Sequence, residues 1–161
     1  PSIVERFGRL DILVHNAGAL NKLTPVAHIE PRDWAEVMAV NLTASWRLIR
    51  SCDPPLRASD AGRAVFVTSG RVLRPRAYWG MYGASKAGME HLVMTWAQEV
   101  EATPLRVNLV DPGVVATKMR AAAMPGEDPS TLPQPADVAP CIAALCLPSE
   151  TRHGARVLIG G

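Results

Sequence analysis

Four short runs of apolar residues recur along the chain, and each is followed by a polar or glycine-containing segment. The runs occupy residues 10–15, 64–68, 105–110 and 155–159. The first run shows no strict alternation of apolar and polar residues, which is typical of a parallel strand buried on both faces, and the second has the same character. The chain is therefore predicted to contain four strands of a parallel sheet.

Two longer segments between these runs have apolar residues at helical spacing. The first covers residues 31–50, where Pro31 suits the first helical position and Pro54-Pro55 lies just past the expected end. The second covers residues 82–101 and is expected to stop at the next proline. Strands that alternate with helices predict an α/β fold, a doubly wound parallel sheet of the Rossmann-like type.

The C-terminal third holds one more expected helix and a long segment without strong periodicity. Residues 118–135 are rich in alanine, proline, glycine and serine and are predicted to form a lid. A helix is expected near residues 137–147, with Asp137 as its cap so that Pro140 falls in the first turn. Residues 1–161 are predicted to form a single domain.

The amino-acid composition argues against several classes of protein. Hydrophobic residues make up 48% of the 161 positions, which argues against a disordered chain, and no apolar run approaches the roughly 18–20 residues that span a bilayer. The net charge of +2 indicates no polyanionic partner, so we expect neither nucleic-acid nor membrane binding. The N-terminus also lacks the apolar stretch of a signal peptide.

The cysteine pattern favours neither a disulfide framework nor a metal site. The chain has three cysteines, an odd number, and no two of them form a Cys-x-x-Cys pair. Cys141 and Cys146 lie in an apolar helical run and are predicted to be buried small side chains. The expectations that follow are a protein of the reducing cytoplasm and no bound metal.

The segment after the second predicted strand carries the candidate chemistry. Ser69 ends this strand, and Tyr82 and Lys86 lie one turn apart on one face of the next helix. A nearby ammonium group is expected to lower the pKa of Tyr82, and Ser69 can orient a substrate oxygen. The three residues suit acid–base chemistry on a carbonyl group. A half-exposed tyrosine beside a surface lysine is the alternative interpretation of the pair.

Asn41 is predicted to face the buried side of its helix, because it lies seven residues after Trp34 and seven before Leu48. A buried amide must find hydrogen-bond partners. The partner can be a neighbouring stretch of backbone, and Asn41 can also have a functional role at the site.

The loop before the tyrosine contains Arg71, Arg74 and Arg76. These arginines either favour an acidic substrate or form a solvated basic loop. Trp79 either forms a wall of the substrate site or packs in a subunit contact. Both alternatives stay open at the level of the sequence.

In order and spacing, these residues resemble the short-chain dehydrogenase/reductase family. The resemblance covers nearly the whole chain and rests on five ordered elements, since a Tyr-x-x-x-Lys pair alone occurs often by chance. The elements are His15-Asn16-Ala17-Gly18, Asn41 in Val40-Asn41-Leu42, Ser69, Tyr82-x-x-x-Lys86 and Pro112-Gly113-x-Val115-x-Thr117. The end of the chain, Gly154 to Gly161, is similar to the last strand and terminal glycines of the family.

The resemblance implies an NAD- or NADP-dependent oxidoreductase that interconverts a small-molecule carbonyl compound and a secondary alcohol, with a tyrosine as proton donor and acceptor. The implied catalytic residues are Asn41, Ser69, Tyr82 and Lys86. The implied cofactor-binding residues are Asn16, Ala17, Gly18, Tyr82, Lys86, Pro112, Gly113, Val115 and Thr117.

Individual roles are implied in the same way. Asn41 would distort its helix locally and hold a water that relays protons to Lys86, which would also hold the nicotinamide ribose. Residues 16–18 would line the ribose and adenine side of the dinucleotide. The backbone near Val115 would pair with the nicotinamide carboxamide, and Thr117 would reach a phosphate.

The glycine-rich turn that opens the family's fold, where backbone amides bind a pyrophosphate, is absent from residues 1–161. The chain is therefore expected to be the C-terminal catalytic portion of a family member, a partial domain without the N-terminal strands of the nucleotide-binding half. The strand at residues 10–15 would then be an exposed apolar edge. The residue that separates NAD from NADP would lie upstream, so either cofactor is expected.

The resemblance also implies a homodimer or homotetramer formed through the helices at residues 31–50 and 82–101. An alternative from a different class is a truncated, non-catalytic remnant that acts as an interaction or assembly module. An unrelated doubly wound fold, such as a methyltransferase, would require the register of serine, tyrosine and lysine to be accidental.

Overall fold

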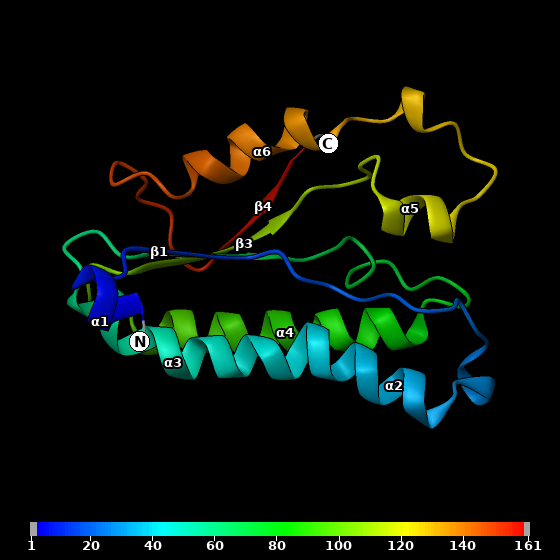
Figure 1. Ribbon diagram of the computed structural model, residues 1–161, viewed down its shortest axis with the longest axis horizontal. Helices are drawn as coiled ribbons and strands as arrows, with labels where there is room; N and C mark the ends of the chain where they lie inside the picture. The colour runs from blue at the N-terminus through cyan, green and yellow to red at the C-terminus, as the bar shows by residue number, and fades with distance from the viewer. Residues whose placement is uncertain (1–2, 160–161) are drawn as a thin grey trace.

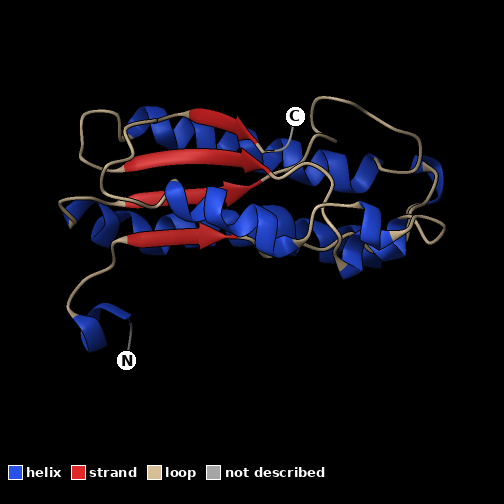
Figure 2. Ribbon diagram, turned by 90° about the horizontal axis from the view of Figure 1, so that it is seen from above, coloured by secondary structure: helices blue, strands red, loops and turns tan. Residues whose placement is uncertain are grey.

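The computed structural model describes residues 3–159 and shows a parallel sheet with helices on both faces (Figure 1). The strands follow one another across the sheet in chain order, and each neighbouring pair is parallel (Figure 2). They are β1 (Ile12–His15), β2 (Arg63–Val67), β3 (Arg106–Asp111) and β4 (Ala155–Leu158). The predicted Rossmann-like α/β fold is confirmed. The terminal glycines of the resemblance, residues 160–161, lie outside the described residues.

Helices form a layer on each face of this sheet. The long helices pack side by side on one face, and a shorter helix lies over the other (Figure 1). The first layer consists of α2 (Pro31–Met38), the π-helical turn η2 (Ala39–Thr43), α3 (Ala44–Ala58) and α4 (Gly80–Glu99). The shorter helix is α6 (Pro135–Ala144), and the other elements are α1 (Ile3–Phe7), α5 (Lys118–Ala123) and the 3₁₀ turns η1 (Val26–His28) and η3 (Pro129–Thr131).

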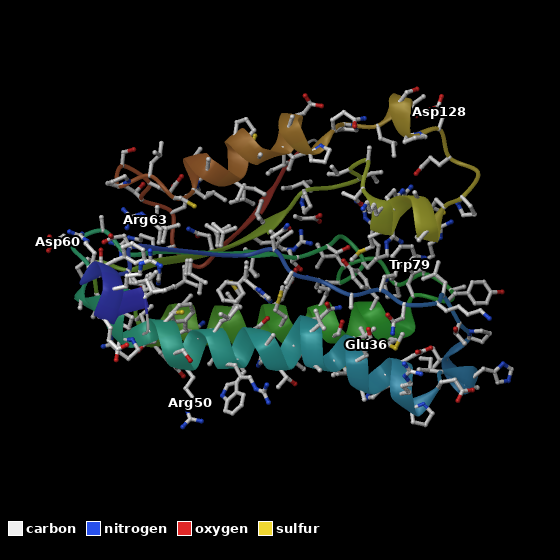
Figure 3. The ribbon with its side chains drawn as sticks, viewed as in Figure 1. Glu36, Arg50, Asp60, Arg63, Trp79 and Asp128 are labelled. Atoms are coloured by element: carbon white, nitrogen blue, oxygen red, sulfur yellow. The ribbon has the colours of Figure 1, made fainter. Side chains whose placement is uncertain are left out.

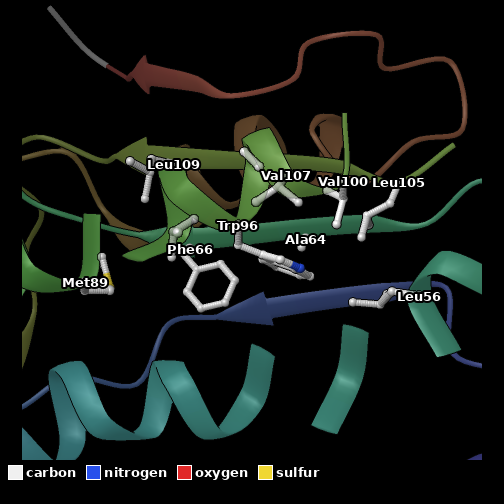
Figure 4. Close-up of a cluster of buried hydrophobic side chains, with 11 residues drawn as sticks. Leu56, Ala64, Phe66, Met89, Trp96, Val100, Leu105, Val107 and Leu109 are labelled. Carbon is white, nitrogen blue, oxygen red and sulfur yellow. The ribbon is translucent and has the colours of Figure 1, made fainter. Parts of the chain in front are cut away.

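The main hydrophobic core lies between the sheet and the α3–α4 pair (Figure 4). Phe66 of β2 is fully buried there and meets Trp96 and His15 edge-on, with ring centroids 6.3 and 5.3 Å apart. Burying a side chain of this size stabilises the fold by about 1.5–3 kcal/mol. On the other face, a smaller cluster joins Val110 of the sheet to Leu145. The strands are thus packed on both faces, which fixes the residues at their ends.

The helix expected over residues 31–50 contains a π-helical turn and extends further than predicted. α3 continues through Pro54 and Pro55, so the prediction that these prolines follow the helix end was wrong. Because proline has no N–H group, Pro54 and Pro55 cannot donate to the carbonyls of residues 50 and 51, and both of these residues are exposed. The fully buried Leu56 anchors the last turn.

The C-terminal helix also departs from prediction. Its N-cap is Gln134, whose N–H donates to the carboxylate of Asp137 at 2.7 Å, so Asp137 lies inside the helix in a capping box. Pro140 is consequently inside the helix as well. Cys141 is exposed, not buried, because the buried stripe of α6 runs through Val138 and the residue four positions later. The second cysteine of this run is half-buried.

β1 forms one edge of the sheet (Figure 2). Its Ile12 and Val14 are 48% and 41% exposed, so the strand is the exposed apolar edge that was expected.

The predicted lid at residues 118–135 contains α5 and η3, and an ion pair between Arg120 and Glu127 links two positions within this segment. Within residues 3–159, no helix is long and apolar enough to cross a membrane, and no cluster of side chains suits a metal ion.

Candidate active site

The carboxyl ends of the strands and the N-terminal end of α4 meet around a cavity of about 600 Å³. Ser69 follows β2, Tyr82 and Lys86 occupy the first two turns of α4, and the segment from Pro112 to Thr117 follows β3. Ser69, Tyr82 and Lys86, three of the four predicted catalytic residues, all line this cavity. In open parallel sheets this edge is where ligands bind, because loops from successive strands leave a crevice there.

Tyr82 is buried in the cavity wall, and its ring meets Trp79 edge-on with centroids 5.8 Å apart. Trp79, which is labelled in Figure 3, is the N-cap residue of α4. Burial raises the pKa of Tyr82 above its usual value, a hydrogen bond with the Ser69 hydroxyl opposes this shift, and the charge of Asp111 adds to it. The net shift is opposite to the predicted lowering, because desolvation outweighs the contributions that favour the phenolate. Tyr82 therefore keeps its proton at neutral pH.

The side chain of Lys86 is buried in the cavity wall, and its amine donates to the backbone carbonyl of Val67 at 2.8 Å. Burial lowers the pKa of Lys86 to about 8, and the carboxylate of Glu90, one turn further along α4, opposes the shift. Burial also lowers the pKa of His15, and the charge of Lys86 lowers it further. The site thus contains a buried cation that loses its charge only above neutral pH.

Replacing Lys86 with methionine is expected to stabilise the fold at neutral pH. The folded state binds the lysine proton less tightly than the unfolded state, so the charged amine costs free energy below its folded pKa of about 8. We expect a gain of about 1–3 kcal/mol in the free energy of unfolding. As the pH rises from about 8 toward 10.5, wild type loses this cost and the two proteins converge. Urea unfolding at a series of pH values measures the difference.

The exposed Lys118 provides the matched control, since Lys118→Met removes a lysine that is already in water. This control should change the free energy of unfolding by less than about 0.5 kcal/mol. The contrary result is a Lys86→Met variant that is less stable than wild type at neutral pH, with a difference that does not vary with pH. It would show that the buried charge does not lower the free energy of unfolding.

Asn41 joins three chain segments inside the molecule. Its Oδ1 accepts from the N–H of Ala19 at 2.8 Å, and its Nδ2 donates to the Ala19 carbonyl at 2.8 Å and to the Ser85 hydroxyl at 2.9 Å. Ser85 donates in turn to the carbonyl of Tyr82 at 2.8 Å. Asn41 is fully buried, as predicted, with backbone among its partners, and it lies behind the cavity lining. Ser85 was missed, although its place directly before Lys86 was a signal.

The first predicted cofactor segment only partly reaches the cavity. Asn16 and Gly18 line it, and Ala17 does not. A Cβ added at Gly18 would lie 3.6 Å from Oδ1 of Asn41 and 3.8 Å from Nζ of Lys86. Glycine therefore leaves open the space between the buried amide and the buried amine, which suits the close approach of a flat ligand group.

The second predicted cofactor segment forms another wall of the cavity. Gly113 has a φ of +70°, a conformation that favours glycine, and its N–H donates to Asp111 at 3.0 Å. The Thr117 oxygen accepts from the N–H of Arg120 as the N-cap of α5, which leaves its hydroxyl proton available for a ligand oxygen. The neighbouring Pro112 and Val115 line the same wall.

The loop before α4 contributes side chains as well. Arg71, Arg74 and Trp79 line the cavity, whereas Arg76 is exposed outside it. The guanidinium of Arg71 lies 5.5 Å from the centroid of the Trp79 ring. Trp79 is therefore a wall of the cavity, one of its two predicted interpretations.

Comparison with known proteins places the chain among dehydrogenases. The model of the short chain dehydrogenase family matches residues 1–128. YciK, an uncharacterized oxidoreductase of Escherichia coli (strain K12), is 42% identical over 138 residues, which are 86% of this chain and 54% of that protein. An uncharacterized NAD-dependent oxidoreductase of Mycobacterium tuberculosis (strain H37Rv) is 38% identical over 117 residues, or 72% of this chain and 42% of that protein.

The fold agrees with that of a protein from Escherichia coli CFT073 solved in complex with NADPH. The TM-score is 0.93 at 38% identity, and the match covers 99% of this chain and 66% of that one. The chain thus spans about half the length of the two curated relatives and about two thirds of the solved structure.

Proposed function

Since the chain belongs to the short-chain dehydrogenase family, we propose that it carries the catalytic residues of an oxidoreductase that interconverts a small-molecule carbonyl compound and a secondary alcohol. The observation that supports this reaction most directly is the gathering of Ser69, Tyr82 and Lys86 around one cavity. The family uses NAD or NADP, and relatives of both kinds match the chain.

Proton transfer is assigned to the hydroxyl of Tyr82. In the reducing direction it donates its proton to the oxygen of the carbonyl group, and in the oxidising direction the phenolate takes a proton from the alcohol. The hydroxyl of Ser69 donates a second hydrogen bond to the same oxygen and stabilises the charge that develops there. The charge of Lys86 stabilises the phenolate. A nicotinamide cofactor, when bound, supplies or accepts the hydride.

The cofactor is assigned to the groups around the same cavity. Lys86 would hold the nicotinamide ribose, and residues 16–18 would line the ribose and adenine side. The backbone near Val115 would meet the carboxamide, and the hydroxyl of Thr117 would donate to a phosphate. We also assign to Asn41 a water that relays protons to Lys86, in the space that the adjacent glycine leaves open.

A panel of ketones and secondary alcohols tests the proposed reaction. The absorbance of NADH and of NADPH is followed separately with each ketone, and products are identified by chromatography. We expect at least one ketone to be reduced to its alcohol, with one reduced cofactor consumed per product. A folded protein that binds a cofactor but turns over no member of a broad panel would favour a non-catalytic assembly role instead.

We further propose that the protein assembles through the outer face of α3 and α4, as a homodimer or homotetramer. Trp46 on this face is 47% exposed, and Arg50 stacks over its ring at 5.8 Å. A shallow hollow beside it extends to Leu92 and Glu99 of α4. A large aromatic residue at the rim of a mixed apolar and charged hollow is typical of subunit interfaces.

Trp46→Glu is expected to shift the protein toward monomers, because it places a carboxylate in the proposed interface. Sedimentation velocity should show a mass reduced by half or more at equal concentration. Leu147→Glu is the control, since Leu147 is 52% exposed and lies on the α6 side of the sheet. An unchanged mass for the tryptophan variant would exclude this face as the contact.

We also propose that the protein works in the cytoplasm. Its three cysteines, Cys52, Cys141 and Cys146, are all free thiols, which is the usual state in a reducing compartment.

A further inference from the structure

Arg156 of β4 reaches the floor of the cavity and ties four elements together. Its Nε donates to Oε1 of Glu90 on α4 at 2.9 Å, and its Nη2 donates to Oδ2 of Asp111 at the end of β3 at 2.9 Å. The same Nη2 donates to the backbone oxygen of Ser69, just after β2, at 3.1 Å. One guanidinium group thus connects β2, β3, β4 and α4 at the edge of the sheet that carries the site.

The two carboxylates are bound to the frame of the site by further contacts. The hydroxyl of Thr68 donates to Glu90 at 2.5 Å, and the N–H of Gly113 donates to Asp111 at 3.0 Å. The side chains of Arg156, Glu90 and Asp111 are only 21%, 12% and 4% exposed. Charges that are shielded from water to this degree are screened weakly and act strongly on their neighbours.

We propose that Arg156 is a positioning residue for the oxidoreductase reaction: it fixes Ser69 and the turn at Asp111 and Gly113, and it compensates the two carboxylates beside Tyr82 and Lys86. The proposal rests on the function proposed above. A guanidinium group suits this task because its fork of donors can hold several acceptors at fixed angles, which an ammonium group cannot do.

The electrostatic part of this role follows from the charges around the catalytic pair. The titratable and charged groups around Tyr82 and Lys86 come from β1, β3, β4, α4, α5 and the loop before α4. They are His15, Asp111, Arg156, Glu90, Arg120, Arg71 and Arg74. Glu90 raises the pKa of Lys86, and Asp111 raises that of Tyr82. Without Arg156, both carboxylates would act uncompensated. The amine and the phenol would then hold their protons more tightly, and proton exchange with substrate would need a higher pH.

The protonation of Lys86 provides a readout that needs neither cofactor nor substrate. The chain contains three lysines, and replacing the exposed Lys22 and Lys118 with arginine leaves one isotope-labelled lysine to titrate by NMR. Its midpoint is expected near 8. In this background, Arg156→Met should raise the midpoint by about half a unit or more. The same substitution should lower kcat/KM by about tenfold or more and shift its pH profile in the alkaline direction.

Arg152→Met is the matched control. Arg152 forms a comparable pair with Glu150, with Nη2 and Oε2 2.5 Å apart, just before β4 and away from the cavity. Both the lysine midpoint and kcat/KM should stay at their wild-type values in this variant.

Two further variants separate charge from geometry. Arg156→Met combined with Glu90→Gln removes the imbalance of charge, so the lysine midpoint should return toward the wild-type value while kcat/KM stays low. Arg156→Lys keeps the charge but loses the fork of donors. It adds a second labelled lysine, and the signal of Lys86 is identified by its presence in the other variants. The Lys86 midpoint should remain near that of wild type, and kcat/KM should fall by about fivefold.

The Lys86 midpoint and the kcat/KM of these variants decide whether Arg156 is a positioning residue. An Arg156→Met protein with wild-type midpoint and wild-type kcat/KM would overturn the proposal. If that variant fails to fold, Arg156→Lys takes its place, and an undiminished kcat/KM there would overturn it equally. A raised midpoint in a protein without any oxidoreductase activity would refute the proposed reaction, while it would uphold the electrostatic effect of Arg156 on Lys86.

Discussion

Tyr82→Phe is expected to lower kcat by about 10³-fold or more and to leave cofactor affinity within a fewfold of wild type. The substitution removes the only group assigned to move a proton to or from the substrate oxygen, and general acid–base catalysis of this kind contributes about 10²–10⁴-fold. The phenylalanine ring keeps the volume of the tyrosine and its edge-on contact with Trp79, so the cavity should keep its shape. Steady-state kinetics and fluorescence titration with the reduced cofactor measure the two effects separately.

Tyr78→Phe is the natural control for this experiment, because Tyr78 and Tyr82 are the two tyrosines of the chain. Tyr78 is 57% exposed, and its backbone carbonyl accepts from the N–H of Thr24. Its variant should turn over like wild type. Near-normal turnover by Tyr82→Phe would mean that another group transfers the proton, and the assignment of Tyr82 would have to be abandoned.

Asn41→Ala is expected to lower the free energy of unfolding by about 2–4 kcal/mol. The substitution removes three hydrogen bonds. The N–H and carbonyl of Ala19 and the hydroxyl of Ser85 each lose the partner that Asn41 provides, at positions that are partly or fully shielded from water. Because Ser85 also holds the turn that carries Tyr82, kcat should fall by about tenfold or more even where the protein is fully folded. Urea unfolding and kinetics at low temperature test the two statements.

Asn108→Ala separates stability from function. Asn108 is a buried asparagine of β3 whose amide likewise holds backbone, donating to the carbonyl of Arg152 at 2.8 Å and accepting from the N–H of Ala155 at 3.1 Å. Its loss should destabilise the fold by about 1–3 kcal/mol and change kcat by less than about twofold. If both variants lose stability to the same degree and neither loses turnover, Asn41 has no part in catalysis.

The strands and the chemistry at their ends were predictable because local patterns determine them. Apolar runs such as residues 64–68 require burial on both faces, and a parallel sheet places all of their carboxyl ends at one edge. Ser69, Tyr82 and Lys86 therefore had to meet once the alternation of strands and helices was recognised. The seven-residue spacing around Asn41 predicted its burial for the same reason, since that spacing is a property of any helix.

Other features depend on contacts between segments that the sequence separates widely. Arg156 bonds to residues 45, 66 and 87 positions away, and the pairing of β2, β3 and β4 together with the packing of α4 on the sheet brings these together. The pKa of Tyr82 was predicted in the wrong direction because the one-turn spacing to Lys86 reveals a charge but not the depth of burial. The continuation of α3 through Pro54 likewise depends on Leu56, whose anchoring in the core is a tertiary contact.

Binding of a nicotinamide cofactor is the most direct test of the claim that this cavity is an oxidoreductase site. NADH and NADPH are titrated separately into the protein, and nicotinamide fluorescence and the thermal unfolding midpoint are followed. We predict saturable binding of at least one of them, a raised Tm, and an affinity at least about tenfold weaker in Lys86→Ala, because the lysine is assigned to the ribose. A folded sample whose fluorescence and Tm respond to neither compound would contradict the claim.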